Sequence, residues 1–395
     1  MPGKKSVRQL DVAHKRVLVR VDFNVPVDRE GNISDDTRIR AALATIEYLR
    51  DRKARVILVS HFGRPKGKVV DSMRLGVVAR RLSELVRGTV KYVPDVEWPL
   101  VAAALADLAA GEVALLENIR FHPGEEINDP GLVGELAALG DMFVNDAFGA
   151  AHRAHASTTG IARRLPSAAG FLMEQELQVL GKTLEEPVRP LVAIIGGAKV
   201  SDKIGVLNNL LQITDALLIG GGMANTFFLA KGLETGSSLV EPEKVPVART
   251  LMDQAAEVGR RMVLPDDVVI AQERTPGTST RVVPVDAIPP AWAALDIGPS
   301  TREVFTRLVE TAGTVIWNGP MGVFELEPFS AGTEALARAV AACPGTTIVG
   351  GGDSIAALEK YGLTDRVDHI STGGGASLEF LEGRELPGVA ALDDA

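Results

Sequence analysis

The chain has 395 residues, a formal net charge of −9, 46% hydrophobic residues and 24% charged residues. The composition is that of a globular protein that can bury a sizeable core, and the length predicts two large domains. The negative charge argues against a nucleic-acid-binding surface, so any anion site has to be local.

Targeting and redox signals give a second set of limits. Cys343 is the only cysteine, which excludes an internal disulfide and a cysteine-based metal site and fits a reducing compartment. Lys4 and Lys5 precede a polar stretch, so no signal peptide is expected, and no apolar run reaches 18 residues. We therefore expect a cytoplasmic protein with neither a membrane nor a nucleic acid as partner.

The first half of the chain repeats one pattern, in which an apolar run leads into polar functional groups. The runs are 17–21, 55–60, 113–116 and 142–144, and each is followed by a polar cluster. Helical patterns lie between them at 37–50, with Asp36 as its expected N-cap, and at 73–86 and 100–110. Alternating strands and helices predict a parallel sheet, and ligands sit at the carboxyl ends of such strands. The polar clusters are therefore expected to converge.

The middle of the chain predicts a connecting helix. Met173, Leu177, Leu180 and Leu184 recur at helical spacing, and Pro187 and Pro190 follow. We expect a domain boundary here, with the helix 171–186 as a hinge between residues 1–170 and 187–378.

The second half repeats a different pattern, in which apolar runs end in glycine. Runs at 191–195, 216–219, 314–317, 346–349 and 369–371 each lead into a glycine-rich turn. Glycine lets backbone N–H groups approach phosphates closely and leaves flat space for a purine. The residues after Gly196 and Gly197 resemble the first turn of a helix, on which Lys199 and Lys203 would share one face. An anion between these two lysines is expected.

The fold predicted from both halves is α/β. It has two lobes, each a parallel sheet wound by helices in a three-layer α/β/α arrangement, joined by the central hinge helix.

Cations after the strands of the first half are candidate ligands for a phosphate or a carboxylate. Arginine suits both anions because it donates paired hydrogen bonds in a fixed plane. The alternative is a set of solvated surface cations, but four of the five candidates share strand-end positions. The candidates are Arg38, His61, Arg64, Arg120 and Arg153.

Single side chains in both halves leave alternatives open. Asp22 and Asn24 could accept from a substrate hydroxyl or shape the turn before Pro26. Asp353 could hold Mg²⁺ on nucleotide phosphates or cap the helix that follows. Glu325 could bind ribose hydroxyls or be an exposed acid. P-loop and Rossmann fingerprints are absent, and a zinc site at His152 and His155 has no carboxylate at ligand spacing.

Taken together, the motifs resemble those of the phosphoglycerate kinase family. The matching segments span nearly the whole chain in the family's order. They are 20–26, 60–65, 117–122, 148–155, 196–203, 220–223, 317–324, 350–354 and 371–377. The resemblance implies reversible, Mg²⁺-dependent transfer of a phosphoryl group between 1,3-bisphosphoglycerate and ADP, giving 3-phosphoglycerate and ATP in glycolysis. It also implies that residues 379–395 pack back on the first lobe, and we expect a hinge-bending monomer.

The resemblance assigns site residues by motif. The implied 3-phosphoglycerate site comprises Asp22, Phe23, Asn24, Arg38, His61, Phe62, Gly63, Arg64, Arg120 and Arg153. The implied nucleotide site comprises Gly197, Lys199, Lys203, Gly221, Gly222, Ala294, Asn318, Glu325, Gly351, Gly352, Asp353 and Ser354, with Asp353 as the metal ligand. Ala294 departs from the family's usual glycine, Phe62 from leucine and Ala150 from threonine.

The mechanism implied by these substrates needs no general base, because both nucleophiles are already anionic. Catalysis then falls on positioning and charge neutralisation, for which we expect Arg38, Lys203, Mg²⁺ and the N–H groups of a turn containing Gly373 and Gly374. Two rivals remain: a nucleotide-dependent binding or regulatory protein without chemistry, and a kinase for another small carboxylate.

Overall fold

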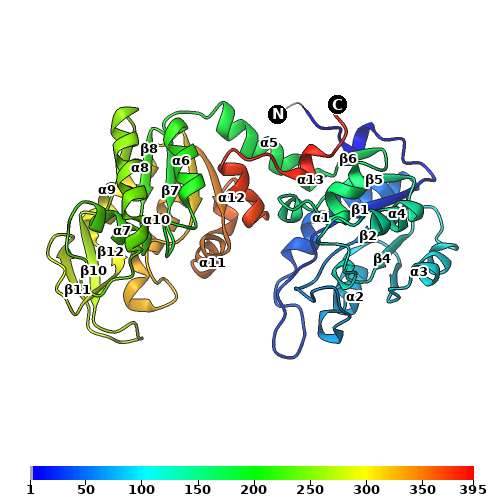
Figure 1. Cartoon of the computed structure of the whole chain (residues 1–395), viewed down its shortest axis with the longest axis horizontal. Coiled ribbons are helices and arrows are strands. Elements are labelled where there is room, and N and C mark those ends of the chain that lie inside the picture. The colour runs from blue at the N-terminus through cyan, green and yellow to red at the C-terminus, as the bar shows by residue number, and fades with distance from the viewer. Residues whose placement is uncertain (1–2) are drawn as a thin grey trace. The chain divides into compact units, whose positions relative to one another are not determined.

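The computed structural model describes residues 3–395, which divide into two compact units. Unit 1 extends to Gln178 and includes Glu385–Ala395, and unit 2 is Val179–Arg384. Helix α5 (Phe171–Glu185) passes from one to the other (Figure 1). In residues 3–395 no helix is long and apolar enough to cross a membrane.

Unit 1 contains a six-stranded parallel sheet. Its strand order is β3 (Val90–Val93), β4 (Val113–Leu116), β2 (Arg55–Val59), β1 (Arg16–Arg20), β5 (Met142–Asn145) and β6 (Ser167–Ala169). Val17 and Val19 of β1 pack with α1 (Thr37–Asp51) and α2 (Gly76–Leu85) on one face. The opposite face is lined by α3 (Trp98–Leu105) and α4 (Pro130–Leu139) around Ile57. Both faces are therefore covered, which explains the continuous apolar strands.

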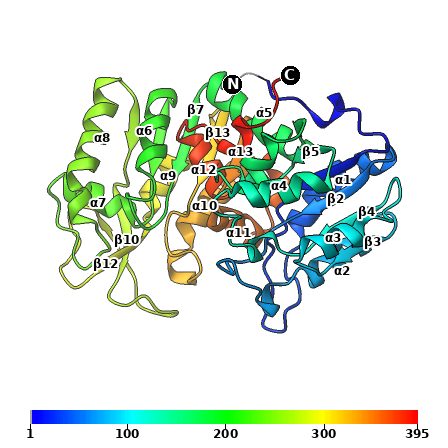
Figure 2. The same cartoon turned by 45° about the vertical axis from the view of Figure 1, so that its right-hand side comes forward.

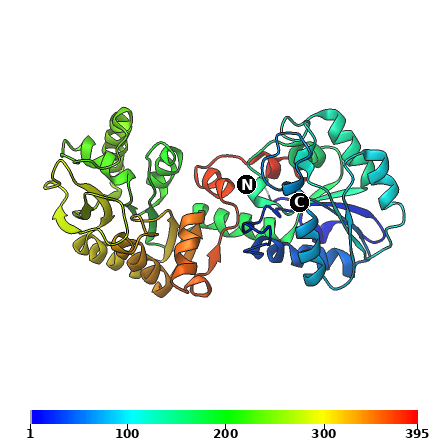
Figure 3. The same cartoon turned by 90° about the horizontal axis from the view of Figure 1, so that it is seen from below.

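The two ends of the chain meet in unit 1 (Figure 3). The backbone N–H of Lys5 donates to the carbonyl of Asp393 at 2.9 Å, and Lys4 pairs with Asp394 at 2.7 Å. The last helix, α13 (Pro387–Ala390), is held by Asn145, whose Nδ2 donates to the carbonyl of Gly388 at 3.0 Å. The C-terminal segment thus completes unit 1.

Unit 2 contains a second six-stranded parallel sheet. Its order is β15 (His369–Ile370), β14 (Thr346–Gly350), β13 (Thr314–Asn318), β7 (Leu191–Ile195), β8 (Ala216–Ile219) and β9 (Arg261–Val263). Helices α6 (Ile204–Ile213), α7 (Met223–Ala230) and α8 (Val245–Glu257) cover one face, with α6 beside α8 (Figure 2). Helices α9 (Pro299–Glu310), α10 (Ala331–Ala342) and α11 (Gly352–Lys360) cover the other. The short helix α12 (Gly375–Leu381) packs on α6.

A smaller antiparallel sheet in unit 2 was not predicted. It has the order β11 (Arg281–Pro284), β10 (Asp267–Ala271) and β12 (Ala293–Ile297). Strands β11 and β12 are exposed or half-buried over most of their length, whereas β10 has a buried apolar run at 268–271 that was not singled out from the sequence.

Several predicted boundaries need correction. Asp36 stands before α1 but forms no side-chain cap, because its carboxylate pairs with Arg40 at 2.8 Å and Arg81 at 2.7 Å. The helix expected at 73–86 is α2, which begins at Gly76, and that expected at 100–110 is α3, which ends at Leu105. The division between the units falls within α5, the helix predicted to connect the two domains, and residues 379–384 group with unit 2, so Glu385–Ala395 are the C-terminal residues that join unit 1.

Candidate active site

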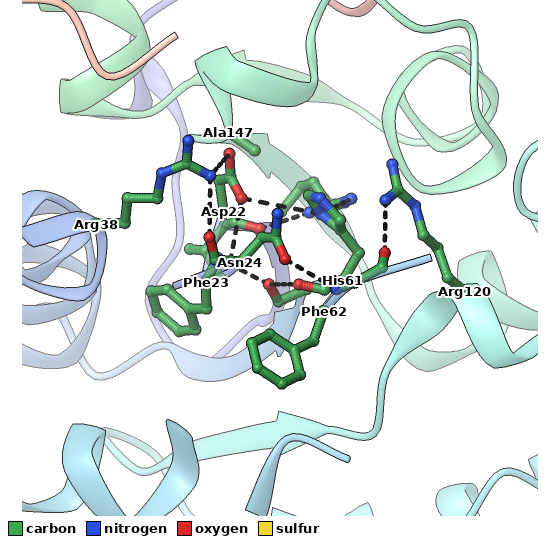
Figure 4. Close-up of polar contacts among 12 residues, drawn as sticks. Asp22, Phe23, Asn24, Arg38, His61, Phe62, Arg120 and Ala147 are labelled. Carbon is green, nitrogen blue, oxygen red and sulfur yellow. Dashed lines mark hydrogen bonds and ion pairs between the residues drawn. The ribbon is translucent and has the colours of Figure 1, made fainter. Parts of the chain in front are cut away.

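The polar clusters after the strands of unit 1 do converge, as Figure 4 shows. Arg38, in the first turn of α1, donates from Nη1 to Asp22 Oδ2 and to the carbonyl of Asn24, both at 3.1 Å. Asp22 and Asn24 follow β1, so the ion pair fixes the loop after the strand against the start of the helix. The Arg38 side chain stays 34% exposed and can still reach a ligand.

The loop after β2 is joined to the same cluster through Gly63. Its N–H donates to Asn24 Oδ1 at 2.8 Å, and its carbonyl accepts from Arg120 Nη1 at 2.9 Å. Gly63 has φ +63°, and a Cβ there would lie 2.9 Å from the sulfur of Met73. Only glycine fits this turn without strain. Phe23 and Phe62 are buried and support the loops from below.

Positive charge is concentrated at these strand ends. Burial, and then the charges of Arg20, Arg120 and Arg38, hold the pKa of His61 well below its ordinary value. Burial, followed by the nearby Arg20 and also Arg153, lowers the pKa of Arg120. Groups that lower one another's pKa in this way favour a bound anion, which would relieve the repulsion.

Two predicted arginines are less constrained. The side chains of Arg64 and Arg153 are exposed, and neither forms a hydrogen bond or an ion pair among residues 3–395. The charge of Arg153 acts on Arg120, which places it at the cluster. Arg64 follows Gly63 in the same loop, and its contacts are not fixed by the protein.

Sequence reasoning did not single out Arg20, although it lies at the centre of this cluster. It is fully buried at the end of β1 and donates from Nη2 toward His61 Nδ1 at 3.1 Å. Its position between Val19 and Val21 could have drawn attention to it, because a charged residue inside an apolar strand requires buried hydrogen-bond or charge partners.

In unit 2, the glycine turns after β7 and β8 interlock with the end of β13 and the loop after it. Backbone N–H groups of Gly196, Gly197 and Gly221 donate to the carbonyls of Asn318, Pro320 and Met321 at 3.0, 3.2 and 3.0 Å. The turns approach so closely that a Cβ on Gly196 would lie 2.1 Å from the carbonyl oxygen of Pro320. The glycines predicted from the sequence are therefore required by main-chain packing around one site.

Lys203, Asn318 and Asp353 lie close together at these turns. Lys203 Nζ donates to Asn318 Oδ1. Burial lowers the pKa of Lys203 to about 8, and the charges of Asp202, Asp353 and Glu382 partly oppose this. Ser354 holds the next turn, because its Oγ accepts from the Gly319 N–H at 2.6 Å. Because burial disfavours the charged lysine, a bound phosphate would stabilise it, which makes Lys203 a candidate anion-binding residue.

Other predicted residues of unit 2 are placed differently. Residues 198–203 form turns and α6 begins at Ile204, so Lys199 and Lys203 do not share a helix face. Lys199 is exposed, and its charge acts on Glu241. Glu325 is exposed on the loop after β13. The Gly373 N–H donates to Ser371 Oγ at 3.3 Å, so it would have to change partner to reach a phosphate, and Gly374 has φ +51°.

Asp353 is the candidate ligand for a metal. It lies exposed in the first turn of α11, whose N-cap is Gly351 and which has no side-chain cap, so the capping alternative is not observed. Among residues 3–395, no group of three histidine, cysteine or acidic side chains could hold a metal alone. This donor set fits Mg²⁺, which is often bound by one or two carboxylates together with substrate phosphates.

A narrow pocket lies beside the glycine turns, between α7, β12 and the loop after β13. It is lined by Gly221, Ala224, Phe228, Ala294 and Met321. The backbone N–H of Ala294 donates to Ser238 Oγ at 2.9 Å, and the pairing of β12 with β10 shifts register between Asp296 and Ala294. The pocket's volume of about 10 Å³ is too small for a purine ring, so a base bound here requires the surrounding segments to move apart.

Comparisons with known proteins identify the family of this chain. A family model described as phosphoglycerate kinase matches residues 7–384. A curated relative named phosphoglycerate kinase from Roseiflexus castenholzii is 62% identical over 395 residues, and the match covers 100% of both chains. A second relative of the same name, from Moorella thermoacetica, is 60% identical over 392 residues, which cover 99% of this chain and 100% of the relative. The solved structure of phosphoglycerate kinase from Coxiella burnetii matches with a TM-score of 0.91 and 43% identity over 98% of each chain.

Proposed function

Because this chain belongs to the phosphoglycerate kinase family, and is therefore a phosphotransferase, we propose that its two units hold the two substrates of that reaction. Unit 1 binds 3-phosphoglycerate or 1,3-bisphosphoglycerate, and unit 2 binds ATP or ADP. The observation that carries the first assignment is the concentration of cations around His61, Arg38 and Arg120 at the strand ends of unit 1.

The cations of unit 1 suit a small acid that already carries a phosphate. Arg38 and Arg120 are oriented by Asp22 and Gly63, respectively, so little side-chain entropy is lost when an anion binds. Arg64 and Arg153 have exposed guanidinium groups that can add to the phosphate. Asn24 supplies a further polar group beside them.

The glycine turns of unit 2 suit nucleotide phosphates. Lys203 neutralises charge at the phosphates, and the turn 351–354 at the start of α11 offers backbone N–H groups. The pocket beside Ala294 opens to take the base, and Glu325 accepts from ribose hydroxyls. Asp353 would hold Mg²⁺, which supplies neutralisation of phosphate charge when bound.

Transfer requires no general base, since the attacking group is a carboxylate in one direction and a phosphate oxygen in the other. The bond from the nucleophile to phosphorus forms in line as the bond to the leaving oxygen breaks. Arg38 and Lys203 stabilise the charge on the transferred phosphoryl group. Because the two substrates lie on different units, we also propose that the units close about α5 during turnover.

The remaining assignments are a monomeric state and a cytoplasmic, glycolytic setting. The single cysteine, Cys343, is half-buried and unpaired, as expected in a reducing compartment.

The proposal is tested by measuring MgATP-dependent turnover of 3-phosphoglycerate, with glycerate and acetate as control acceptors. We expect turnover with 3-phosphoglycerate only. Turnover of glycerate would favour a kinase for unphosphorylated acids, and nucleotide binding without turnover would favour a regulatory protein.

A further inference from the structure

The hydrogen bond between Arg20 and His61 determines which ring nitrogen of His61 carries a proton. Arg20 Nη2 lies 3.1 Å from His61 Nδ1, and both side chains are buried. A guanidinium has donors only, so Nδ1 has to accept. The proton of a neutral His61 is then on Nε2, and a doubly protonated ring would place two donors against each other.

Arg20 is itself held in place by the carbonyl of Val21, to which its Nη1 donates, and by Ser157, which is hydrogen-bonded to Glu125. Its Nε donates to Ser157 Oγ at 2.7 Å, and this hydroxyl donates to Glu125 Oε1 at 2.6 Å. Glu125 also accepts from the Ser157 backbone N–H at 2.9 Å. Ser157 lies in a π-helical turn, η5 (Ala156–Gly160). Arginine, serine and glutamate therefore form one buried chain that ends at His61.

The charges around His61 act in the same direction. Arg20, Arg38, Arg120 and His155 all disfavour the protonated ring, and burial disfavours it more strongly still. The one carboxylate nearby, Asp22, has its Oδ1 3.9 Å from His61 Nδ1 and is paired with Arg38. The negative charge of Glu125 is directed to His155, whose Nδ1 lies 3.7 Å from Oε1, and to Arg20 and Ser157.

We propose that Arg20, oriented by Ser157 and Glu125, is a positioning residue that fixes His61 as the neutral Nε2–H tautomer. His61 then serves the substrate subsite as a neutral hydrogen-bond donor and not as a cation. This inference rests on the proposed role of His61 in binding phosphoglycerate. It explains why a charged residue ends the buried strand β1 without reaching the solvent.

The direct test is nitrogen NMR of the full chain labelled with ¹⁵N-histidine. The six histidines are separated by comparison with a His61→Gln spectrum. We expect the Nδ1 shift of His61 to be pyridine-like and the Nε2 shift pyrrole-like, with no titration from about pH 5.5 to about pH 8, a range that spans the ordinary histidine pKa of ~6.5. A pyrrole-like Nδ1, or a titration midpoint within that range, would overturn the proposal.

Variants test whether Arg20 causes this state. In Arg20→Met the donor is gone, so His61 should titrate and the KM for 3-phosphoglycerate should become pH-dependent. Ser157→Ala leaves the charges in place and should give a smaller change of the same kind. It provides a second test in case Arg20→Met does not fold. Arg16→Met is the matched control, because Arg16 begins the same strand and pairs with Asp141 at the surface. Unchanged His61 shifts in both Arg20→Met and Ser157→Ala would contradict the role.

Two substitutions of His61 test whether its Nε2–H donates to the substrate, independently of the tautomer assignment. Glutamine places an N–H near Nε2, whereas asparagine places its amide near Nδ1. We expect the KM for 3-phosphoglycerate to rise about 10- to 100-fold more for His61→Asn than for His61→Gln. Equal KM values would refute the donor role. If 3-phosphoglycerate shifts no His61 signal while the tautomer is as stated, then the proposed subsite is wrong and the tautomer assignment stands.

Discussion

A single methyl group at Gly196 should disable the nucleotide site. The Cβ of Gly196→Ala would lie 2.1 Å from the carbonyl oxygen of Pro320 and 2.7 Å from that of Gly319. Relieving the first contact requires the Pro320 backbone to move by roughly 1 Å, a displacement of the size that can cost about 100-fold in rate when it misplaces a site. The same movement would break the 3.2 Å hydrogen bond from the Gly197 N–H.

The expected magnitudes follow from these contacts. Overpacking costs about 1–3 kcal/mol and one lost hydrogen bond about 0.5–1.5 kcal/mol, so the free energy of unfolding should fall by roughly 2–4 kcal/mol. We expect kcat/KM for MgATP to fall about 100-fold, while the KM for 3-phosphoglycerate changes little because unit 1 is untouched.

Steady-state kinetics at varied MgATP and thermal unfolding of the same preparations measure both effects. The matched control is Gly134→Ala in α4, where a Cβ meets nothing within 4 Å, and where alanine should be neutral or stabilise by up to about 1 kcal/mol. If Gly196→Ala has wild-type kinetics and stability, then the loop after β13 moves away at little energetic cost. That result would refute the claim that close packing against this loop requires glycine at position 196.

Four further predictions address charge and motion. Arg38→Ala should lower kcat by about 10²–10³-fold with little change in the KM for MgATP. Arg40→Ala, on the same helix, should change neither kcat nor this KM. An equal loss of nucleotide affinity in Arg38→Ala would contradict the role of Arg38. Because the pKa of Lys203 is lowered to about 8, the KM for nucleotide should rise by up to tenfold per pH unit above about 8, and Lys203→Arg should flatten this profile. Burial raises the pKa of Asp296 to about 7, so between about pH 4 and about pH 7 the folded state binds a proton that the unfolded state does not. The free energy of unfolding should therefore fall as pH rises through this range, by at most about 1.4 kcal/mol per pH unit. If urea titrations give the same slope of unfolding free energy against pH for Asp296→Asn, this group is excluded as the source. Small-angle scattering should show a smaller radius of gyration with both substrates than with either alone, and an unchanged value would count against closure.

The sequence predicted the parallel strands and the residues at their ends well, for a physical reason. Buried parallel strands are continuous apolar runs, so 191–195 and 216–219 are recognised from composition alone. Because all such strands end at one edge of a sheet, residues as distant as Asp22 and Arg120 could be expected together. The largely exposed or half-buried strands β11 and β12 leave no such run, and the buried run 268–271 of β10 was overlooked.

Side-chain partners were harder to predict, because they depend on distant residues. Asp36 has the sequence position of an N-cap, but Arg81, 45 residues away, competes for its carboxylate. Lys199 and Lys203 have helical spacing, yet the intervening turn directs Ser201 to Glu241 and delays the helix to Ile204. The family resemblance supplied the site residues, and Arg20 was missed because its role depends on contacts with Ser157 and His61.

The meeting of both chain ends in unit 1 has a consequence for how the protein is made. The first 178 residues of unit 1 are synthesised early, but the segment that completes this unit, Glu385–Ala395, is synthesised last. This segment supplies the β-bridge to Lys4 and the carbonyl that accepts from Asn145. Unit 2, whose residues are contiguous, can finish folding while unit 1 still waits for its final segment. A circular permutant that joins the two ends by a short linker and opens the chain in a surface loop of unit 2 would make unit 1 contiguous and remove that delay.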